Sequence, residues 1–211
     1  MDVNAVIWAL AGYISGSIPW GYLVGRAKGI DITKRGSGNI GGANVARNLG
    51  MGYGVLVMLL DLLKGFVPAY LAHAYAGIHY ALLAAMFAII GAVFSIFLKF
   101  RGGKGFATIT GGYLALVTAT GTWGPLPVMI TTWFVVVLLT QMTGLANIVT
   151  IVTAIPLHAL IADPLMTTYV TFAALAVLYS HRDNIVLMLQ GKLEEQRFSH
   201  KGKRSITMDK V

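Results

Sequence analysis

The 211-residue sequence contains no cysteine and unusually little charge. The absence of cysteine excludes disulfides, cysteine zinc ligands and thiol nucleophiles. Only 11% of the residues are charged and 56% are hydrophobic, whereas a typical soluble domain is about 25% charged. Residues 105–162 contain no Asp, Glu, Lys or Arg. Together these deficits favour an integral membrane protein over a soluble one.

Apolar segments long enough to cross a bilayer as helices, about 20 residues each, divide most of the chain. We predict seven spanning helices, at residues 4–24, 51–75, 78–100, 105–120, 125–141, 144–161 and 165–179. The segment 105–120 is short and rich in Gly and Thr, so the pattern also allows a count of six. The expected fold class is an all-α bundle. Residues 1–191 would form its transmembrane domain, and 192–211 a polar, basic tail.

The distribution of the 16 Lys and Arg residues predicts the orientation. With the N-terminus outside, all of them except Lys64 fall in cytoplasmic segments, and the outer turns near residues 76, 122 and 163 have none. This asymmetry fits the positive-inside rule and puts the C-terminus in the cytoplasm. The net charge of +8 then faces anionic membrane lipids. A nucleic-acid role is not expected, because the sequence shows no binding module.

Several features within the spans indicate packing. Gly12 and Gly16, like Gly21 and Gly25, have the four-residue spacing that lets helices approach closely. Pro19 is expected to kink the first span. Asp61 and Lys64 are three residues apart on one helix and can form an ion pair. This pair is read either as purely structural or as a brace beneath a functional site.

Three polar clusters fall on the inner side of the predicted bundle, namely GSGNIGGANVAR at 36–47, KFRGGKG at 99–105 and HRDN at 181–184. A transporter would be expected to place polar groups near the midplane of the membrane. Here the midplane is almost empty apart from Asp61 and Lys64. Polar groups at the inner interface are typical of an enzyme that joins a lipid-soluble substrate to a water-soluble one.

The glycine-rich segment GSGNIG formally matches the dinucleotide fingerprint, but that motif needs a preceding strand, and a spanning helix precedes it here. GGKG lacks the upstream glycine and following Ser or Thr of a P-loop. A flexible linker is the other alternative. We favour a phosphate cradle, in which glycine amides form a concave nest. Its candidate residues are Gly36, Ser37, Gly38, Asn39, Gly41, Asn44, Arg47, Gly102, Gly103 and Lys104. His181 and Asn184 share a helix face and could orient a hydroxyl.

The three clusters, read as SIPWGYLVGRAKGIDITKRGSGNIGGANVARNLG, KFRGGKGFAT and HRDNIVLMLQG, together with DLLKG at 61–65, resemble the bacterial acyl-phosphate:glycerol-3-phosphate acyltransferases, the PlsY family. The resemblance implies a seven-helix enzyme of the bacterial cell membrane, with its active site on the cytoplasmic side and no metal or cofactor. Such an enzyme transfers a fatty acyl group from acyl phosphate to the 1-hydroxyl of glycerol 3-phosphate. It releases lysophosphatidate and inorganic phosphate.

The resemblance also implies residue roles. Ser37 and the glycine amides would hold the acyl-phosphate headgroup, Arg47 and Lys104 glycerol 3-phosphate, and His181 and Asn184 the acceptor hydroxyl. Whether His181 is a general base or a substrate phosphate takes the proton is left open. The sequence does not set the oligomeric state, and a monomer is compatible with it.

This chain departs from the family pattern at four positions. The family usually has Thr at Ala43, His at Ala92, Ser at Gly144 and a basic residue near Leu187. Ala43 and Gly144 each remove a hydroxyl that could contact a phosphate. The departures keep two alternatives open: a paralogue that acylates another phosphorylated acceptor, and a non-catalytic lipid-binding or transport protein of the same fold.

Overall fold

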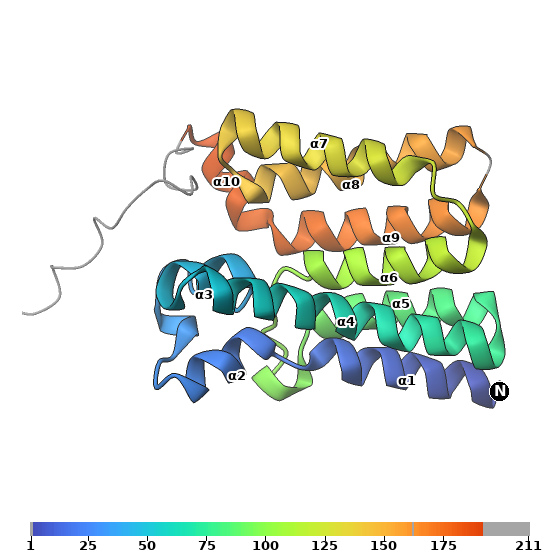
Figure 1. Ribbon diagram of the computed structural model, residues 1–211, viewed down its shortest axis with the longest axis horizontal. Coiled ribbons are helices and arrows are strands. Elements are labelled where there is room, and N and C mark those ends of the chain that lie inside the picture. Colours follow the sequence, from blue (N-terminus) through green and yellow to red (C-terminus); the bar gives the residue numbers. More distant parts are fainter. Residues whose placement is uncertain (1, 162, 192–211) are drawn as a thin grey trace, which may run out of the picture.

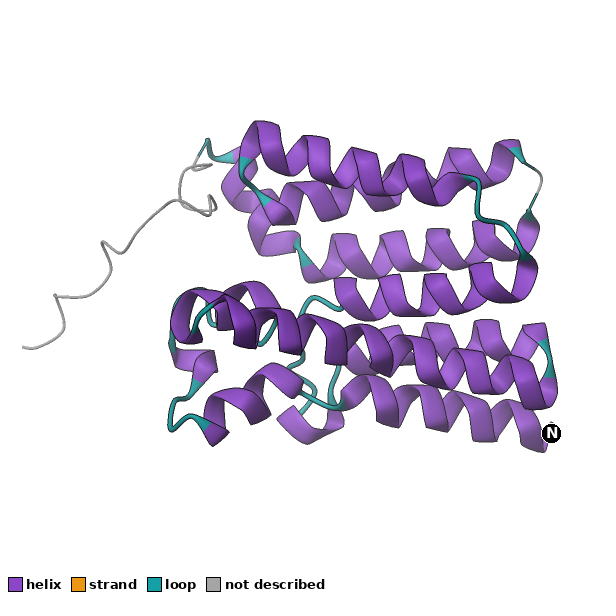
Figure 2. Cartoon of the chain, viewed as in Figure 1, coloured by secondary structure: helices purple, strands orange, loops and turns teal. Residues whose placement is uncertain are grey.

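A computed structural model describes residues 2–161 and 163–191, and this part of the chain is helical, with no strand (Figure 2). The predicted polar tail at 192–211 lies outside the described residues. The all-α prediction is therefore confirmed for the rest of the chain.

Apolar helices of at least 15 residues run alongside one another (Figure 1). They are α1 (Val3–Ser17), α4 (Met51–Ala76), α5 (Ile78–Val93), α6 (Phe106–Thr120), α7 (Pro125–Thr140), α8 (Thr143–Leu160) and α9 (Pro164–Ser180). Among the described residues, the segments Met51–Ala76, Ile78–Leu98 and Thr143–Leu160 are each long and apolar enough to cross a membrane. Helices α1, α4, α5 and α6 pack as one group and α7, α8 and α9 as another, and α9 contacts both α5 and α6.

Short helices gather at the end of the bundle opposite the N-terminus (Figure 1). They are α2 (Trp20–Ala27), α3 (Gly42–Leu49) and α10 (Arg182–Leu189), and two 3₁₀ turns, η1 (Ile32–Lys34) and η2 (Ile96–Leu98), complete the fold. The three polar clusters found in the sequence are carried by these short elements and their loops. One end of the bundle is therefore polar, as the predicted topology requires.

Small residues bring the helices into close contact, as the glycine spacing predicted. A Cβ atom on Gly12 would overlap the carbonyl group of Ala84, and one on Gly16 would overlap that of Ala88, both on α5. In contrast, large apolar side chains point outward, and Leu138 and Leu139 on α7 are 75% and 80% exposed. An apolar exterior around a tightly packed interior suits a protein surrounded by lipid.

The first predicted span, residues 4–24, is wrong as a single helix, because the helix breaks between α1 and α2. Pro19 has no N–H and cannot continue the hydrogen-bond ladder, so α1 ends at Ser17 and Ile18 is extended. The freed carbonyl oxygens find side-chain donors. Ser95 Oγ donates to Ser17 O at 2.5 Å, and Lys64 Nζ donates to Ile18 O at 3.1 Å.

Asp61 completes this arrangement from α4. Its Oδ1 lies 2.8 Å from Lys64 Nζ, and the two side chains are only 15% and 7% exposed. Ser15 Oγ also donates to Lys64 O at 2.8 Å. The ion pair is thus confirmed, and it braces the break that leads into α2.

The third predicted span, residues 78–100, also ends earlier than expected. Helix α5 stops at Val93, and the chain passes through η2 before Lys99 and Phe100 adopt left-handed backbone angles, with φ of 54° and 62°. The chain then returns to the end of α5, where the Gly102 amide donates to Val93 O at 3.0 Å. This reversal places residues 99–105 against the end of the helix instead of extending the span.

Candidate active site

Asn44, at the start of α3, organises the glycine-rich loop before it. The residue is 2% exposed. Its Nδ2 donates to the carbonyl oxygens of Ile32, Arg35 and Asn39 at 3.2, 3.0 and 2.8 Å, and its Oδ1 accepts from the Ser37 amide at 3.0 Å. Because these bonds engage both ends of the amide, Asn44 holds the loop in shape. This is a different task from the phosphate contact expected from the sequence.

Glycines of the same loop also serve its shape. Gly36 and Gly38 have φ of 57° and 71°, in the left-handed region that favours glycine. A Cβ on Gly36 would overlap Asn44 Oδ1. The Gly38 amide donates to Arg35 O at 2.9 Å. The loop thus uses the amides of Ser37 and Gly38 in internal hydrogen bonds, and phosphate binding by its glycines stays a prediction.

The N-terminus of α3 offers two further backbone amides. Among the described residues, the amides of Gly42 and Ala43 have no hydrogen-bond acceptor, as is normal for the first turn of a helix. Helix N-termini bind anions through such amides and the helix dipole. Arg47 lies one turn further along α3 and is exposed, and Ser37 is exposed in the preceding loop. Anion-binding groups therefore concentrate here.

The second cluster packs against the first through Gly103. A Cβ on Gly103 would lie 3.2 Å from Ile40 Cγ1 and 3.4 Å from Asn39 Oδ1. The Gly103 amide donates to Ala92 O at 2.9 Å, just as the Gly102 amide is used by Val93 O. In this structure both amides cap the end of α5, and the binding of phosphate by Gly102 and Gly103 stays a prediction.

Lys104 joins the second cluster to the third. Its Nζ donates to Asn184 Oδ1, and its carbonyl oxygen accepts from Ser180 Oγ at 3.1 Å. Burial lowers the pKa of Lys104 to about 8; Asp183 opposes this shift, and the positive charge of Arg47 adds to it. Arg47 thus acts electrostatically on Lys104 across the two loops. The structure brings together Arg47, Lys104 and Asn184, which are far apart in the sequence.

His181 lies at the end of α9 and is completely buried. Its Nδ1 is 3.0 Å from Val177 O, and its Nε2 is 3.3 Å from Asn147 Nδ2 on α8. Burial and the nearby Lys104 charge lower the pKa of His181 to about 4, against the opposing effect of the Val177 bond. His181 is therefore neutral near pH 7, and both of its ring nitrogens are engaged.

Asn147 was not among the candidates derived from the sequence. Its signal is nevertheless visible, because it is one of the few strongly polar side chains in the charge-free segment 105–162. Such residues in apolar helices generally face a neighbouring helix and bond to it. Helix α8 also carries Gly144, where a Cβ would lie 3.0 Å from Asn184 Nδ2 and 3.6 Å from His181 Cδ2. The hydroxyl missing at Gly144 would therefore reach this site.

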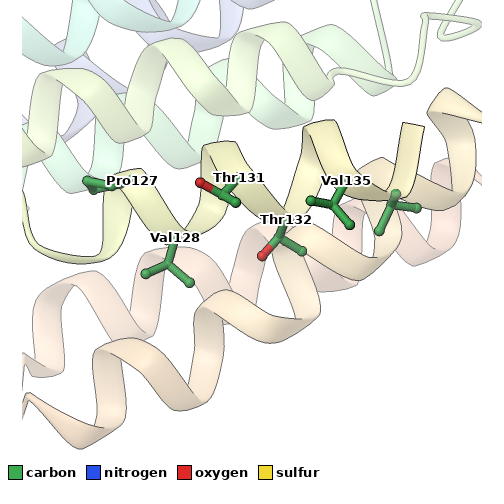
Figure 3. A pocket seen from close by; sticks show the side chains of 6 residues that line it. Pro127, Val128, Thr131, Thr132 and Val135 are labelled. Carbon is green, nitrogen blue, oxygen red and sulfur yellow. The ribbon is translucent and has the colours of Figure 1, made fainter. Parts of the chain in front are cut away.

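Two apolar grooves lie on the bundle. One, of about 440 Å³, runs along one face of α7 (Figure 3) and is lined by Pro127, Val128, Thr131, Thr132, Val135 and Val136. It contains no candidate site residue. The other, of about 170 Å³, lies between α5 and α9, and its lining includes Phe94 and Tyr179, whose ring centroids are 5.3 Å apart with the ring planes tilted by 42°. Tyr179 is two residues from His181, so this second groove approaches the polar cluster.

The described residues hold no group of three or more His, Asp or Glu side chains that could bind a metal ion. The groups that the structure gathers at this end of the bundle include cations, amides and hydroxyls. These groups suit the binding and neutralisation of phosphate.

Comparisons with known proteins agree along nearly the whole chain. The family model described as glycerol-3-phosphate acyltransferase matches residues 6–191. The chain is 43% identical over 188 residues to a glycerol-3-phosphate acyltransferase of Rubrobacter xylanophilus, covering 88% of this chain and 92% of the relative. It is 40% identical over 190 residues to one from Carboxydothermus hydrogenoformans, covering 88% and 93%.

Solved structures give the same result. The chain resembles PlsY (YgiH), an integral membrane glycerol 3-phosphate acyltransferase crystallised in a glycerol 3-phosphate form, with a TM-score of 0.81 and 31% identity. The match covers 89% of this chain and 93% of that one. The lysophosphatidic acid form of that protein matches with a TM-score of 0.80.

Proposed function

The chain belongs to the glycerol-3-phosphate acyltransferase family, and we propose that it transfers a fatty acyl group from acyl phosphate to the 1-hydroxyl of glycerol 3-phosphate. The products are lysophosphatidate and inorganic phosphate, which places the enzyme in phospholipid synthesis. One observation supports the assignment of the site. Lys104 donates a hydrogen bond to Asn184, and the positive charge of Arg47 helps to lower the pKa of Lys104, so residues of all three polar clusters interact.

Two phosphate groups must be held close together in this reaction, and their repulsion must be neutralised. The free amides of Gly42 and Ala43, with the hydroxyl of Ser37, are suited to the headgroup of acyl phosphate. Arg47 presents a planar fork to the phosphate of glycerol 3-phosphate, and Lys104 adds a point charge between the two. Asn184, bonded to Lys104, orients the acceptor hydroxyl.

The transfer needs no covalent enzyme intermediate, because acyl phosphate is an activated mixed anhydride. The 1-hydroxyl oxygen forms a bond to the acyl carbonyl carbon, and the bond from that carbon to the phosphate oxygen breaks. We assign the hydroxyl proton to a substrate phosphate oxygen, because Asn147 already occupies Nε2 of His181. Catalysis then rests on positioning and electrostatic stabilisation.

The surroundings of the site agree with a lipid donor. The groove between α5 and α9 is apolar and ends near Phe94 and Tyr179, so we propose that it takes the part of the acyl chain next to the carbonyl. We further propose seven membrane spans, formed by α1 and α4 to α9, with the N-terminus outside. Residues 1–191 form the catalytic domain, and the basic tail lies on the cytoplasmic side of a bacterial cell membrane.

A direct assay tests the proposed reaction. The purified protein in lipid is given palmitoyl phosphate and labelled glycerol 3-phosphate, and labelled lysophosphatidate is measured. We expect product with acyl phosphate and none when a palmitoyl thioester replaces it. Substitution Lys104→Ala should remove the activity, whereas the same substitution at exposed Lys28 should not.

Other results would identify the alternatives. No ester product from glycerol 3-phosphate, but product from another phosphorylated alcohol, would indicate a paralogue with a different acceptor. The missing hydroxyls at Ala43 and Gly144 make this the second candidate. Movement of labelled lipid or phosphate across liposomes without any new ester would indicate transport and would overturn the enzymatic assignment.

A further inference from the structure

A series of side-chain hydrogen bonds runs from α7 through α8 to the end of α9, where the third polar cluster, residues 181–184, begins. Trp133 Nε1 on α7 donates to Asn147 Oδ1 at 2.8 Å. On the other side of the same amide, Asn147 Nδ2 lies 3.3 Å from His181 Nε2. His181 Nδ1 in turn lies 3.0 Å from Val177 O. Three helices are thus linked through polar groups.

The donors in this chain determine the state of the histidine. An indole N–H only donates, so Trp133 requires the oxygen of the Asn147 amide to face it. The Nδ2 group, which also only donates, must then face His181. Its partner Nε2 must therefore be an unprotonated acceptor, which leaves the ring proton of neutral histidine on Nδ1. A proton on Nδ1 is also what the Val177 carbonyl oxygen needs as its donor.

The consequence reaches the residues that contact substrate. Asn184 lies one turn after His181 and holds Lys104 Nζ, while Ser180, next to His181, donates to Lys104 O at 3.1 Å. The orientation of the imidazole therefore sets the end of α9 and the start of α10. We propose that Asn147, oriented by Trp133, is a positioning residue that locks His181 in its neutral Nδ1–H form beneath the acyl-transfer site. This inference rests on the function proposed above.

Nitrogen NMR of ¹⁵N-histidine-labelled protein tests the tautomer without any activity measurement. The signal of His181 is identified as the one missing from a His181→Gln sample. Near neutral pH we expect Nδ1 to be protonated and Nε2 to be unprotonated. A protonated Nε2 in the wild-type protein would overturn the proposal, whatever lipid product the enzyme makes.

Variants of Asn147 test its effect on catalysis. Asn147→Asp keeps an acceptor for Trp133 but has no donor for Nε2, so the ring should shift to its Nε2–H or doubly protonated form. We expect kcat to fall roughly tenfold or more, as for a lost hydrogen bond that also misplaces its partner, with a smaller change in KM. Asn147→Ala should lower kcat as well, without adding the carboxylate's charge near Lys104.

Two substitutions on α7 distinguish the effect of the hydrogen bonds from that of simple packing. Trp133→Phe removes only the indole donor, so the amide can turn and the NMR signals should show a mixture of tautomers. Phe134→Leu is the matched control, because Phe134 packs edge-on against Trp133 but is 55% exposed. It should leave the tautomer and kcat unchanged. The proposed positioning of His181 would be refuted by a wild-type tautomer in Trp133→Phe or by a wild-type kcat in folded Asn147→Asp. If Asn147→Asp does not fold, the NMR spectrum of Trp133→Phe decides.

Discussion

Replacing Asn44 with alanine should unfold the glycine-rich loop that precedes α3, while the helical bundle stays intact. The side chain uses both amide hydrogens on backbone carbonyl oxygens and accepts bonds from the Ser37 amide and from Asn48 Nδ2, at 3.0 and 3.2 Å. Four bonds at about 0.5–1.5 kcal/mol each amount to roughly 2–6 kcal/mol. Most of them are only partly buried, so the lower part of this range, about 2–4 kcal/mol, is the reasonable expectation.

A loss of this size shifts the equilibrium between the closed and open loop by roughly 30- to 1,000-fold. The open loop exposes the peptide bonds after Lys34 and Arg35 to trypsin and no longer holds Ser37 beside the start of α3. We therefore expect rapid cleavage at residues 34 and 35, detected by mass spectrometry, and a higher KM for acyl phosphate. Thermal unfolding of the whole bundle should change little.

The matched control is Asn48→Ala, which removes one donor to Asn44 but leaves its bonds to the loop in place. This variant should resist trypsin nearly as well as the wild-type protein. The trypsin digestions of the two variants and the wild-type protein are compared in the absence of substrate. If Asn44→Ala raises the KM for acyl phosphate but remains resistant to trypsin, Asn44 acts by contacting phosphate, as its position in the sequence motif suggested. That result would refute its role in holding the loop.

Further predictions concern charge and stability. Burial lowers the pKa of Lys104 to about 8, and its charged form binds phosphate, so kcat/KM should fall as the pH rises through about 8. Lys104→Arg should move this fall to higher pH. A fall at the same pH in the variant would exclude Lys104 as its source. Asp61→Asn leaves Lys64 without its ion partner and should lower the free energy of unfolding, measured by denaturation in detergent, by about 3–5 kcal/mol. The double variant Asp61→Asn with Lys64→Met should lose less free energy of unfolding. Equal losses would show that the two residues do not stabilise the protein as an ion pair. Ala43→Thr should add a hydroxyl at the start of α3 worth about 1.5–3 kcal/mol, which lowers KM for acyl phosphate by roughly 10- to 150-fold. The isosteric Ala43→Val should not lower it, and equal KM values for the two variants would place this position away from the acyl-phosphate headgroup.

The helical segments and the meeting of the polar loops could be predicted from the sequence, because they depend on composition and on the distribution of charge along the chain. Helical segments can be recognised because a membrane demands long apolar runs. The convergence of residues near 47, 104 and 184 follows from topology alone, since loops on one side of a small bundle must meet. By contrast, the break at Pro19 was expected only as a kink. Its sharpness depends on Lys64 and Ser95, which reach the freed carbonyl oxygens from other helices.

The roles of individual polar groups could not be predicted in the same way. A glycine in a sequence indicates conformational freedom, but it does not say which partner its amide will find. Gly102 and Gly103 bond to the end of α5 because the chain reverses there, and that reversal depends on left-handed angles at Lys99 and Phe100. The free amides lie at Gly42 instead, where a helix begins.

The same reasoning explains why His181 was expected to face substrate. A histidine in a polar motif at the end of a helix looks available, and only the fold reveals that α8 supplies Asn147 to its second nitrogen. The partner could be found only by asking why a charge-free segment retains an amide at all. In a membrane bundle that question is productive, because an unpaired amide in an apolar region is costly. The Asn147 amide in this segment therefore implies partners on neighbouring helices, and here those partners are Trp133 and His181, at the end of the bundle that carries the proposed active site.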